Sequence, residues 1–411
     1  MSPVWLWLQF ALCAAVIAAA GARLSRSGDR IATATGLTGG WIGLALLATV
    51  TSLPELAAGI SAVTVVGAPN LAVGNALGSC VFNLLFLVVI DLLFREAPLY
   101  RRAAQAHLLS AAFAIVMLGF VTMSLLLGAA TPSWLQVGLY SPLLLTLYLL
   151  ALRNVYHHER AAGAAAKLTA DVSTISLPQE WRRFAAAAAL VVAAGVWLPS
   201  VADDIASAHG WSRSFVGTLF VAFVTTLPEL AVTLAALRLR ALDLAIGNLL
   251  GSTLFNVAIL AVDDLAYREG PLLAHVAPVH AGTAVSAIVM AALVIVGLVL
   301  RPQGRVLRTL SWVSVGLLTV CLLNAALVML HSEPPAPPRS TLPQAVPGGQ
   351  PASGAAASLS PPASSAADAA LSRTTVTGTG LWSSSDSATE PRPPASGSPT
   401  PRAPMTTASQ P

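Results

Sequence analysis

Ten apolar runs, most of them long enough to cross a lipid bilayer, occupy the first 330 residues of the chain. A helix needs about 20 apolar residues to span a hydrocarbon core of about 30 Å. The runs therefore predict an all-α membrane protein with ten transmembrane helices. We place these spans at residues 3–22, 37–66, 70–93, 104–128, 134–152, 184–201, 212–239, 243–264, 274–300 and 306–330.

The composition agrees with a membrane protein. Hydrophobic residues make up 55% of the 411 residues and charged residues only 10%, whereas a soluble chain carries about 25% charged residues. The formal net charge of +4 comes from arginines in short loops and does not indicate a nucleic-acid partner. Cys13, Cys80 and Cys321 lie far apart in apolar runs, so they suggest neither a disulfide nor a cofactor. The partner that this composition implies is the lipid bilayer.

The placement of basic residues predicts the orientation in the cell membrane. Loops after odd-numbered spans hold 16 Lys and Arg residues, and loops after even-numbered spans hold only Arg213 and Arg268. The positive-inside rule places the first set in the cytoplasm and both termini outside. The first 22 residues contain no Lys or Arg and are longer than a typical signal-peptide core, so we expect an uncleaved first span.

A sequence repeat divides the spans into two groups of five. The segment "DRIATATGLTGGWIGLALLATVTSLPEL", from Asp29, aligns without a gap with "DDIASAHGWSRSFVGTLFVAFVTTLPEL", from Asp203. "PNLAVGNALGSCVFN", from Pro69, then matches "LDLAIGNLLGSTLFN", from Leu242, at 9 of 15 positions. Because five is odd, the second group enters the membrane in the opposite sense. Such inverted repeats are typical of transporters, whose sites lie at the midplane between the repeats.

The repeat also predicts how the chain is organised. A cytoplasmic loop joins the two five-helix repeats, and a tail rich in Pro, Ser and Ala follows the second repeat. This tail has too few apolar residues to fold into a core, and we expect it to be disordered. The first repeat, the loop, the second repeat and the tail are predicted at residues 1–152, 153–183, 184–331 and 332–411, with the repeated polar motifs at 51–83 and 225–256.

Each repeat carries a glutamate beside a proline near the middle of an apolar run. Glu55 follows Pro54 in "TSLPEL", and Glu229 follows Pro228 in "TTLPEL". A proline frees the carbonyl four residues before it, and an unpaired carboxylate in the middle of a bilayer is costly. Inverted repeats that pack about a two-fold axis would bring the two acids together. A cation from solution would then neutralise them.

A polar stripe lies on the span that follows each glutamate. Its side chains recur every four residues, so they share one helix face, and adjacent glycines allow a close approach to the proline break of the neighbouring span. Alone, each Ser or Asn is better explained as an interhelical hydrogen bond, and each Pro as a kink, but the repetition in register favours a functional set. The stripes are Asn75, Ser79 and Asn83, and Asn248, Ser252 and Asn256.

The side chains of the two motifs form an all-oxygen inventory. It contains carboxylates, hydroxyls, amide oxygens and main-chain carbonyls, which suit hard cations such as Na⁺ and Ca²⁺. Its charge of −2 matches one Ca²⁺ or two Na⁺, and competition of the two ions for one site is the basis of antiport. Other duplicated polar pairs receive structural interpretations. For Asp91/Asp264 and Glu96/Glu269 we expect helix-end salt bridges with Arg95 and Arg268. For His107/His280 we expect interfacial hydrogen bonds.

The motifs "TSLPEL…AVGNALGSCVFN" and "TTLPEL…AIGNLLGSTLFN" resemble the two repeats of the sodium/calcium exchanger family, within the cation/calcium antiporter superfamily. The resemblance covers roughly residues 5–330. It implies ten helices in two inverted halves, with discontinuous second and seventh helices, and it implies a transporter rather than an enzyme.

The resemblance also implies a set of ion ligands. Glu55 and Glu229 would be the central ligands of Ca²⁺ and Na⁺. The remaining ligands would be Thr51, Thr225, Ser52, Thr226, Ser79 and Ser252, flanked by Asn83 and Asn256. Thr226 stands where the family usually has Ser, and Cys80 and Thr253 stand where "GSN" is typical. Asn256 stands where microbial members often have Asp, which removes a possible proton acceptor.

The leading hypothesis is a secondary antiporter that exchanges Na⁺ for Ca²⁺ by alternating access around the paired glutamates. The alternative on the same scaffold is H⁺-coupled exchange of Ca²⁺ or another cation, although proton-coupled relatives tend to show "GNxxEL". An intramembrane hydrolase would need a nucleophile or metal-binding histidines, which the motifs lack. A passive channel would carry ions without a counter-ion.

Overall fold

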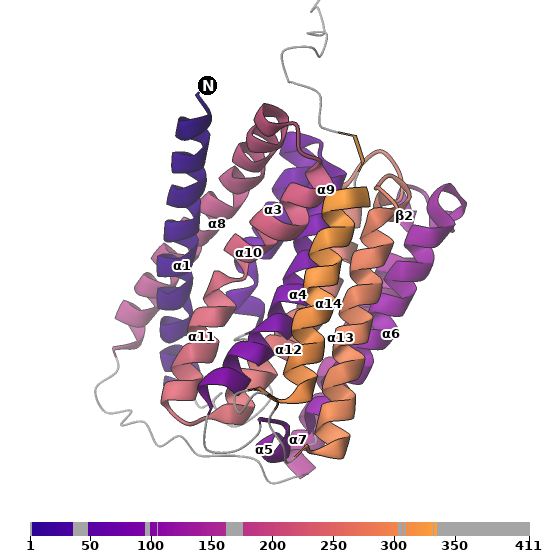
Figure 1. Ribbon diagram of the computed structural model, residues 1–411. Helices are drawn as coiled ribbons and strands as arrows, with labels where there is room; N and C mark the ends of the chain where they lie inside the picture. The colour runs from indigo at the N-terminus through magenta and orange to yellow at the C-terminus, as the bar shows by residue number, and fades with distance from the viewer. Residues whose placement is uncertain are drawn as a thin grey trace, which may run out of the picture. The chain divides into compact units, whose positions relative to one another are not determined.

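The computed structural model describes residues 2–35, 48–94, 99–104, 106–161, 176–302, 306, 310–331 and 333–334. The predicted tail at 332–411 lies outside these residues except for positions 333 and 334. The described part is almost entirely helical (Figure 1), in agreement with the predicted fold class.

The long helices of the first repeat are α1 (Pro3–Ala34), α4 (Pro69–Leu93), α6 (Ala106–Leu127) and α7 (Tyr140–Ala161). Those of the second repeat are α8 (Leu177–His209), α12 (Leu242–Ala266), α13 (Val279–Leu300) and α14 (Trp312–His331). The second and seventh predicted spans are broken into shorter pieces, which are α3 (Leu53–Ser61) and η1 (Ala62–Val66), and α9 (Arg213–Phe215), η4 (Val216–Val221), α10 (Ala222–Thr225) and α11 (Leu227–Arg238). The connections contain α5 (Leu99–Arg102), η2 (Gly128–Ala130), the hairpin of β1 (Ser133–Trp134) and β2 (Val137–Gly138), and η5 (Leu272–Ala274).

Each of the ten predicted spans contains helical residues in its described part. Among the described residues, seven helices are long and apolar enough to cross a membrane alone, and the bent pair Arg213–Thr225 and Leu227–Arg238 makes an eighth. The other two predicted spans coincide with the shorter apolar helix Leu53–Val66 and with α7. Residues 37–47 of the predicted second span lie outside the described residues.

Several helix ends differ from the hydropathy boundaries. Helix α1 continues to Ala34 rather than ending at residue 22, and α8 covers Leu177–His209 rather than 184–201. Hydropathy falls at the first charged residue, but the helical hydrogen bonds continue because polar helix formers tolerate the membrane surface and water. The fifth span begins at Tyr140 instead of residue 134, because the β1–β2 hairpin takes up the residues before it.

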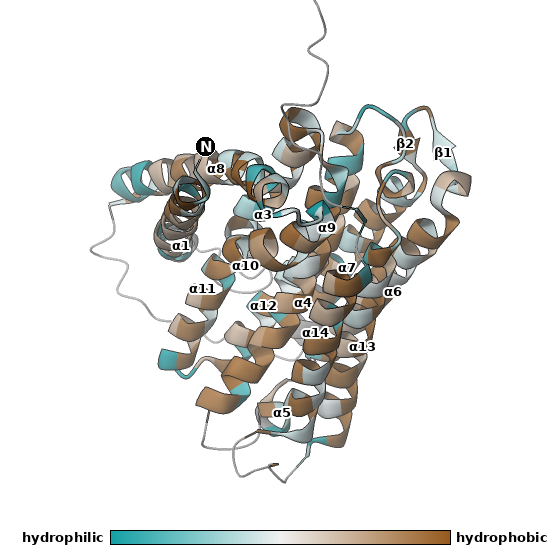
Figure 2. Cartoon of the chain, turned by 45° about the horizontal axis from the view of Figure 1, so that its top comes forward, coloured by the Kyte–Doolittle hydropathy of each residue, from teal (hydrophilic) through white to brown (hydrophobic). Residues whose placement is uncertain are grey.

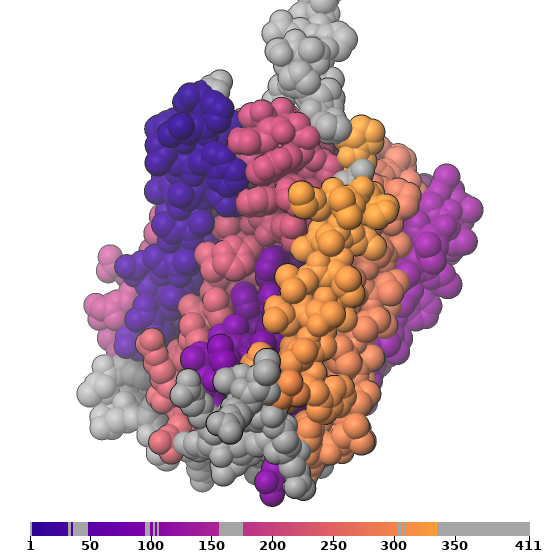
Figure 3. All heavy atoms as spheres, in the orientation of Figure 1, coloured from indigo at the N-terminus to yellow at the C-terminus, as the bar shows by residue number. Residues whose placement is uncertain are grey.

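Helices α4 and α12 form the centre of the bundle. Of the most apolar 18 residues in each, 72% and 78% are buried, compared with 28% in α14. Helix α14 is apolar along most of its length (Figure 2), and the outer helices expose large apolar side chains, as expected for surfaces that face lipid. These include Leu8, Leu12, Leu126, Leu149 and Leu322. In the space-filling view, α1 and α14 both lie at the surface of the bundle (Figure 3).

The helix contacts repeat reciprocally between the two halves. Helix α6 packs on α7 as α13 packs on α14, and α12 contacts α7 as α4 contacts α14. Across the halves, α8 packs on α3 as α1 packs on α11. Such reciprocity is the property of elements related by a two-fold axis. It agrees with the inverted repeat that the odd number of spans predicted.

Both broken spans change direction at the residue before a proline-containing turn. Ser52 and Thr226 have ψ angles of 14° and 0°, away from helical values. Pro54 and Pro228 then lie in the first turns of α3 and α11, where the missing N–H leaves no helical hydrogen bond unmade. In the seventh span the two pieces are bent by 40°. The breaks are thus encoded locally by the Leu-Pro-Glu sequence.

Glycines bring each central helix close to the broken span of the opposite repeat. A Cβ atom added to Gly78 of α4 would lie 2.7 Å from the Cβ atom of Ala222 in α10. The equivalent Gly251 of α12 faces Ala48, at 3.2 Å. The sequence predicted these close approaches but assigned them to the adjacent span of the same repeat. The structure adds a partner across the repeats, which periodicity on one helix could not identify.

We expect Gly78→Ala to destabilise the protein, because the added methyl group meets Ala222 and the carbonyl oxygen of Thr218. Overpacking of this kind costs about 1–3 kcal/mol in the free energy of unfolding. The measurement is the melting temperature of the purified chain in detergent. Gly119→Ala in α6 is the matched control, because nothing lies within 4 Å of its added Cβ. Equal melting temperatures for the two variants would contradict the close packing.

Candidate functional site

The two repeated glutamates begin the second halves of the broken spans. Glu55 lies in the first turn of α3 and Glu229 in the first turn of α11, and both are 0% exposed. The positive end of a helix dipole stabilises a negative charge at this position. Their carboxylates lie close enough to repel each other electrostatically. Among the described residues, neither glutamate has an ion-pair partner within 4.0 Å.

The carboxylates receive few hydrogen bonds. Ser52 Oγ donates to Glu229 Oε1 at 2.7 Å, across the boundary between the repeats. Glu229 Oε2 and both carboxylate oxygens of Glu55 have no hydrogen-bond partner in the described part of the chain. A buried anion without donors is unfavourable in lipid. These three oxygens are therefore suited to a positively charged ligand.

The hydroxyl groups also meet across the repeats. Thr51 Oγ1 lies 3.4 Å from Ser252 Oγ, and Thr225 Oγ1 lies 3.5 Å from Ser79 Oγ. Thr226 Oγ1 donates to Ser79 Oγ at 3.2 Å. The residues before each proline break therefore contact the central helix of the opposite repeat. The structure in this way places six predicted hydroxyl residues at the level of the two acids.

Two asparagines support the main chain at the breaks. Asn75 Nδ2 donates to the carbonyl oxygen of Glu55 at 3.2 Å, and Asn248 Nδ2 donates to that of Glu229 at 3.3 Å. Thr225 Oγ1 donates to Asn75 Oδ1 at 3.0 Å. The sequence placed both asparagines on the polar stripes but gave them no role. Their partner could not be derived from spacing, because spacing defines a helix face and not the atom that it meets.

Asn83 and Asn256 occupy equivalent positions two turns further along α4 and α12. Both are fully buried, and none of their side-chain nitrogen and oxygen atoms has a hydrogen-bond partner among the described residues. The sequence predicted that they flank the central position. The structure gives them no side-chain hydrogen bond to the other eight predicted residues, so their role as ligands stays a prediction.

The site is composed of oxygen atoms. Within the described ranges, no group of three or more His, Cys, Asp or Glu residues could hold a metal ion. An ion at the paired glutamates would therefore complete its shell with hydroxyl, amide and main-chain oxygens, as Na⁺ and Ca²⁺ do. Such a site suits a transported ion, which must be released as well as bound.

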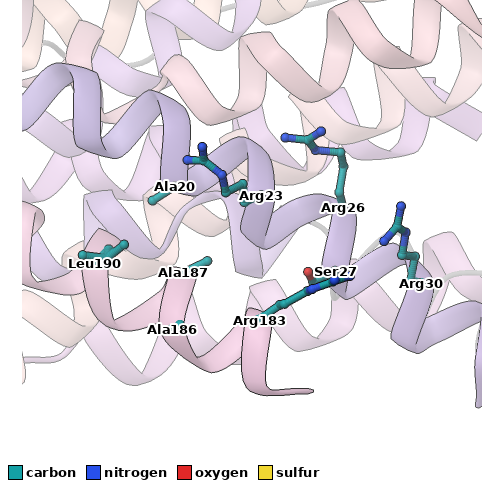
Figure 4. Close-up of a pocket in the computed structure, with 9 residues that line it drawn as sticks. All are labelled: Ala20, Arg23, Arg26, Ser27, Arg30, Arg183, Ala186, Ala187 and Leu190. Atoms are coloured by element: carbon teal, nitrogen blue, oxygen red, sulfur yellow. The ribbon is translucent and has the colours of Figure 1, made fainter. Parts of the chain in front are cut away.

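A cavity of ≈ 410 Å³ lies elsewhere, between α1 and α8, and has the opposite charge. Its lining includes Arg23, Arg26 and Arg30 of α1 and Arg183 of α8, which reaches towards Ser27 (Figure 4). Glu180 Oε1 accepts hydrogen bonds from Arg30 at 3.0 Å and Arg183 at 2.7 Å. Arginines repel cations, so this cavity is not the candidate cation site. The Arg30–Glu180 ion pair instead joins α1 to α8, whereas the Arg183–Glu180 pair lies within α8.

The prediction of a helix-end salt bridge is wrong for Asp264. This buried carboxylate accepts hydrogen bonds from the main-chain N–H of Gly138 at 2.9 Å and from Tyr140 OH at 2.6 Å, as well as from Ser141 and the N–H of Leu272. Its equivalent, Asp91, accepts from the N–H groups of Leu99 and Ser311 and from Ser314 Oγ. Neutral donors of the fold satisfy these carboxylates without burying an arginine. Arg95 and Glu96 lie outside the described residues.

Interfacial hydrogen bonds, predicted for the two repeated histidines, are formed. His107 Nε2 lies 3.1 Å from Asp243 Oδ1. His280 Nε2 lies 2.9 Å from Ser214 Oγ and 3.2 Å from Asn70 Oδ1. All of these contacts join helices of the bundle, and none involves the paired glutamates.

The described helices form two repeats, and each repeat carries a buried glutamate at a proline break. This arrangement is typical of a membrane ion transporter. The chain belongs to the sodium/calcium exchanger family, whose sequence profile matches residues 5–156 and 181–328. This family comprises membrane ion antiporters, and the expected relationship is thereby confirmed.

Two curated proteins illustrate the relationship. The inner membrane protein YrbG of Escherichia coli (strain K12) is 25% identical over 242 residues, which cover 56% of this chain and 72% of YrbG. The putative antiporter CaxA of Alkalimonas amylolytica is 29% identical over 229 residues, which cover 54% of this chain and 69% of CaxA.

The fold is similar to that of a solved structure of the sodium-calcium exchanger NCX_Mj. The two chains superpose with a TM-score of 0.52 and 22% sequence identity, over 79% of this chain and 99% of the exchanger. This similarity concerns the fold alone and supports the assignment of the fold class.

Proposed function

We propose that this protein exchanges Na⁺ for Ca²⁺ by alternating access around Glu55 and Glu229. The observation that carries the proposal is the pair of buried carboxylates at the two proline breaks, with three oxygens that have no donor in the described part of the chain. One Ca²⁺ or two Na⁺ would neutralise this charge. Because both ions need the same carboxylates, binding of one would displace the other.

The hydroxyl residues of the two motifs would complete the sites. At each break, a threonine of one repeat pairs with a serine of the other, as Thr51 with Ser252 and Thr225 with Ser79. A movement of one repeat against the other would therefore change the ion coordination at both breaks. Ser52 and Thr226 lie at the breaks themselves and would serve the Na⁺ sites. Asn83 and Asn256 would flank the central position with their unpartnered amide groups.

The helices that pack on the breaks suggest how access could alternate. A Cβ atom added to Gly195 of α8 would lie 3.1 Å from the carbonyl oxygen of Pro54. Gly21, at the equivalent position of α1, lies against the ring of Pro228. Helices α1 and α8 also pack on each other. Movement of this pair along the breaks would transmit to the first turns that carry the glutamates.

The arginine distribution further leads us to infer that both termini lie outside and that the loop at 153–183 lies in the cytoplasm. Arg23, Arg26, Arg30 and Arg183 of the α1–α8 cavity belong to this set of arginines. The sided transport measurements described below test it.

The test of the function is ⁴⁵Ca²⁺ flux into proteoliposomes that contain the purified full chain. We expect uptake into Na⁺-loaded vesicles and little uptake into vesicles loaded with K⁺ or choline. Protein-free liposomes are the control for leakage. Uptake that follows a pH gradient and ignores the Na⁺ gradient would instead establish H⁺-coupled exchange. Flux without any counter-ion would indicate a channel.

A further inference from the structure

Asp263 is a buried carboxylate that the paired-glutamate site does not include. It lies near the C-terminal end of α12 and is 0% exposed. Neither Oδ1 nor Oδ2 has a hydrogen-bond partner among the residues that the structure describes, whereas the adjacent Asp264 accepts several hydrogen bonds. Ionisable residues inside a membrane are costly and mark the paths of ions or protons. Asp263 therefore calls for a functional explanation.

The carboxylate of Asp263 lies against the bare backbone of Gly59 in α3. A Cβ atom added to Gly59 would lie 2.6 Å from Asp263 Oδ1. Gly59 follows Glu55 by four residues and so lies on the same face of α3, about 6 Å further along the helix. The absence of a side chain at Gly59 thus leaves room for a carboxylate one helical turn from the central site.

The opposite half of the protein has no equivalent acid. In the sequence repeat, Asp263 aligns with Ile90, which is buried among apolar side chains. Gly59 aligns with Thr233, whose hydroxyl lies 3.5 Å from Asn248 Nδ2. Duplicated residues such as Asp264 serve both halves alike. An acid present in one half only is suited to a task on one side of the membrane.

Asp263 lies between the paired glutamates and the predicted outer face. Helix α3 leads from Glu55 to the loop after the second span, and α12 ends at the loop that contains Arg268. The positive-inside rule places both loops outside. Asn256 precedes Asp263 by two turns of α12 and also has an unpartnered amide group. The two side chains therefore share the face that runs from the centre towards the outer surface.

We propose that Asp263 is an additional cation-binding residue in the outer access path. It would bind Na⁺ or Ca²⁺ that enters from outside and pass the ion to Glu55 and Glu229, with the amide oxygen of Asn256 as an intermediate ligand. The inference rests on the proposed cation exchange. It predicts that the outer and inner faces differ in their apparent affinity for ions.

The first test is sided transport with Asp263→Asn, which removes the charge but preserves the shape. In right-side-out membrane vesicles, we expect the half-saturating external Ca²⁺ concentration to rise at least about 10-fold. In everted vesicles, the value for the cytoplasmic face should change less than about twofold. A merely structural role would alter both faces equally, and this outcome or an unchanged external value would overturn the proposal.

A second variant moves the carboxylate without removing it. In Gly59→Ala, the new methyl group would displace Asp263 from its position, and we expect the same one-sided loss of external affinity. Gly119→Ala is the matched control, because its added Cβ meets nothing within 4 Å. Gly59→Ala with unchanged external affinity would contradict the proposed location. Melting temperatures of both variants establish that the comparison is made on folded protein.

A binding measurement separates this proposal from the proposed function. In the full chain with Glu55→Gln and Glu229→Gln, infrared difference spectra on addition of Ca²⁺ or Na⁺ should still show a change in a carboxylate band. Asp263→Asn in the same background should remove that band. A spectrum that shows no cation-induced carboxylate change would overturn the proposal for Asp263. Na⁺-driven ⁴⁵Ca²⁺ uptake into proteoliposomes by the unmodified chain tests the proposed exchange. Its outcome does not depend on the infrared result for Asp263.

Discussion

Glu55→Gln is expected to reduce Na⁺-dependent ⁴⁵Ca²⁺ uptake by at least about 100-fold. The substitution halves the negative charge at the two breaks, and a loss of about 3 kcal/mol in binding free energy corresponds to this factor. Both oxygens of Glu55 lack donors in the described part of the chain, so glutamine cannot replace the attraction that they offer a cation. The measurement is the initial rate of uptake into Na⁺-loaded proteoliposomes.

The same substitution should leave the fold intact. Neither carboxylate oxygen of Glu55 has a hydrogen-bond partner of normal geometry among the described residues, so glutamine breaks no such bond, and it removes one of two buried negative charges. We therefore expect a melting temperature equal to or above that of the unmodified chain when no Ca²⁺ is present. The rise in melting temperature on addition of Ca²⁺ should disappear, because the ligand no longer stabilises the folded state.

Glu180→Gln is the matched control, since it neutralises a buried glutamate outside the site. Glu180 accepts hydrogen bonds from Arg30 and Arg183 at the α1–α8 cavity. Exchange in this variant should stay within a few-fold of that of the unmodified chain. Retention of most of the uptake by Glu55→Gln, or an equal loss in Glu180→Gln, would contradict the assignment of the ion site.

The sequence predicted the helices and breaks because both depend on local chemistry. Long apolar runs must be helical in lipid, and Pro54 and Pro228 interrupt hydrogen bonding wherever they occur in a helix. The inverted arrangement followed from an odd number of spans per repeat. The helix ends were less predictable, because α1 and α8 continue through charged residues that hydropathy assigns to loops.

Partners across the repeats could not be predicted from periodicity. Spacing places Ser79 on the same face as Asn75, but only the packing of α4 on α10 brings Ser79 to Thr225 and Thr226. Asp91 and Asp264 were assigned to salt bridges because arginines follow them in the sequence. In the fold, N–H groups and hydroxyls from distant loops reach them first. Asp263 was not predicted, because it does not recur in the first repeat, where Ile90 stands at the equivalent position.

Asp264→Asn should be among the most destabilising single substitutions outside the ion site. Asp264 accepts hydrogen bonds from the N–H groups of Gly138 and Leu272 and from the hydroxyls of Tyr140 and Ser141. An asparagine presents an NH₂ group to some of these donors, which leaves buried donors unpaired. Each such donor costs about 1–3 kcal/mol. We expect the melting temperature to fall by roughly 10 °C.

Asp263→Asn supplies the control for this prediction at the adjacent position. Both aspartates are fully buried in α12, and both variants lose one negative charge. Asp263 has no hydrogen bond to lose within the described residues, so its variant should melt at or above the temperature of the unmodified chain. Similar melting temperatures for Asp264→Asn and Asp263→Asn would show that the hydrogen bonds of Asp264 do not stabilise the fold. A fall in melting temperature for Asp264→Asn alone would show that Asp264 joins the end of α12 to η5 and to the β1–β2 hairpin. Asp263 makes no such hydrogen bonds within the described residues, so its carboxylate remains available to ions.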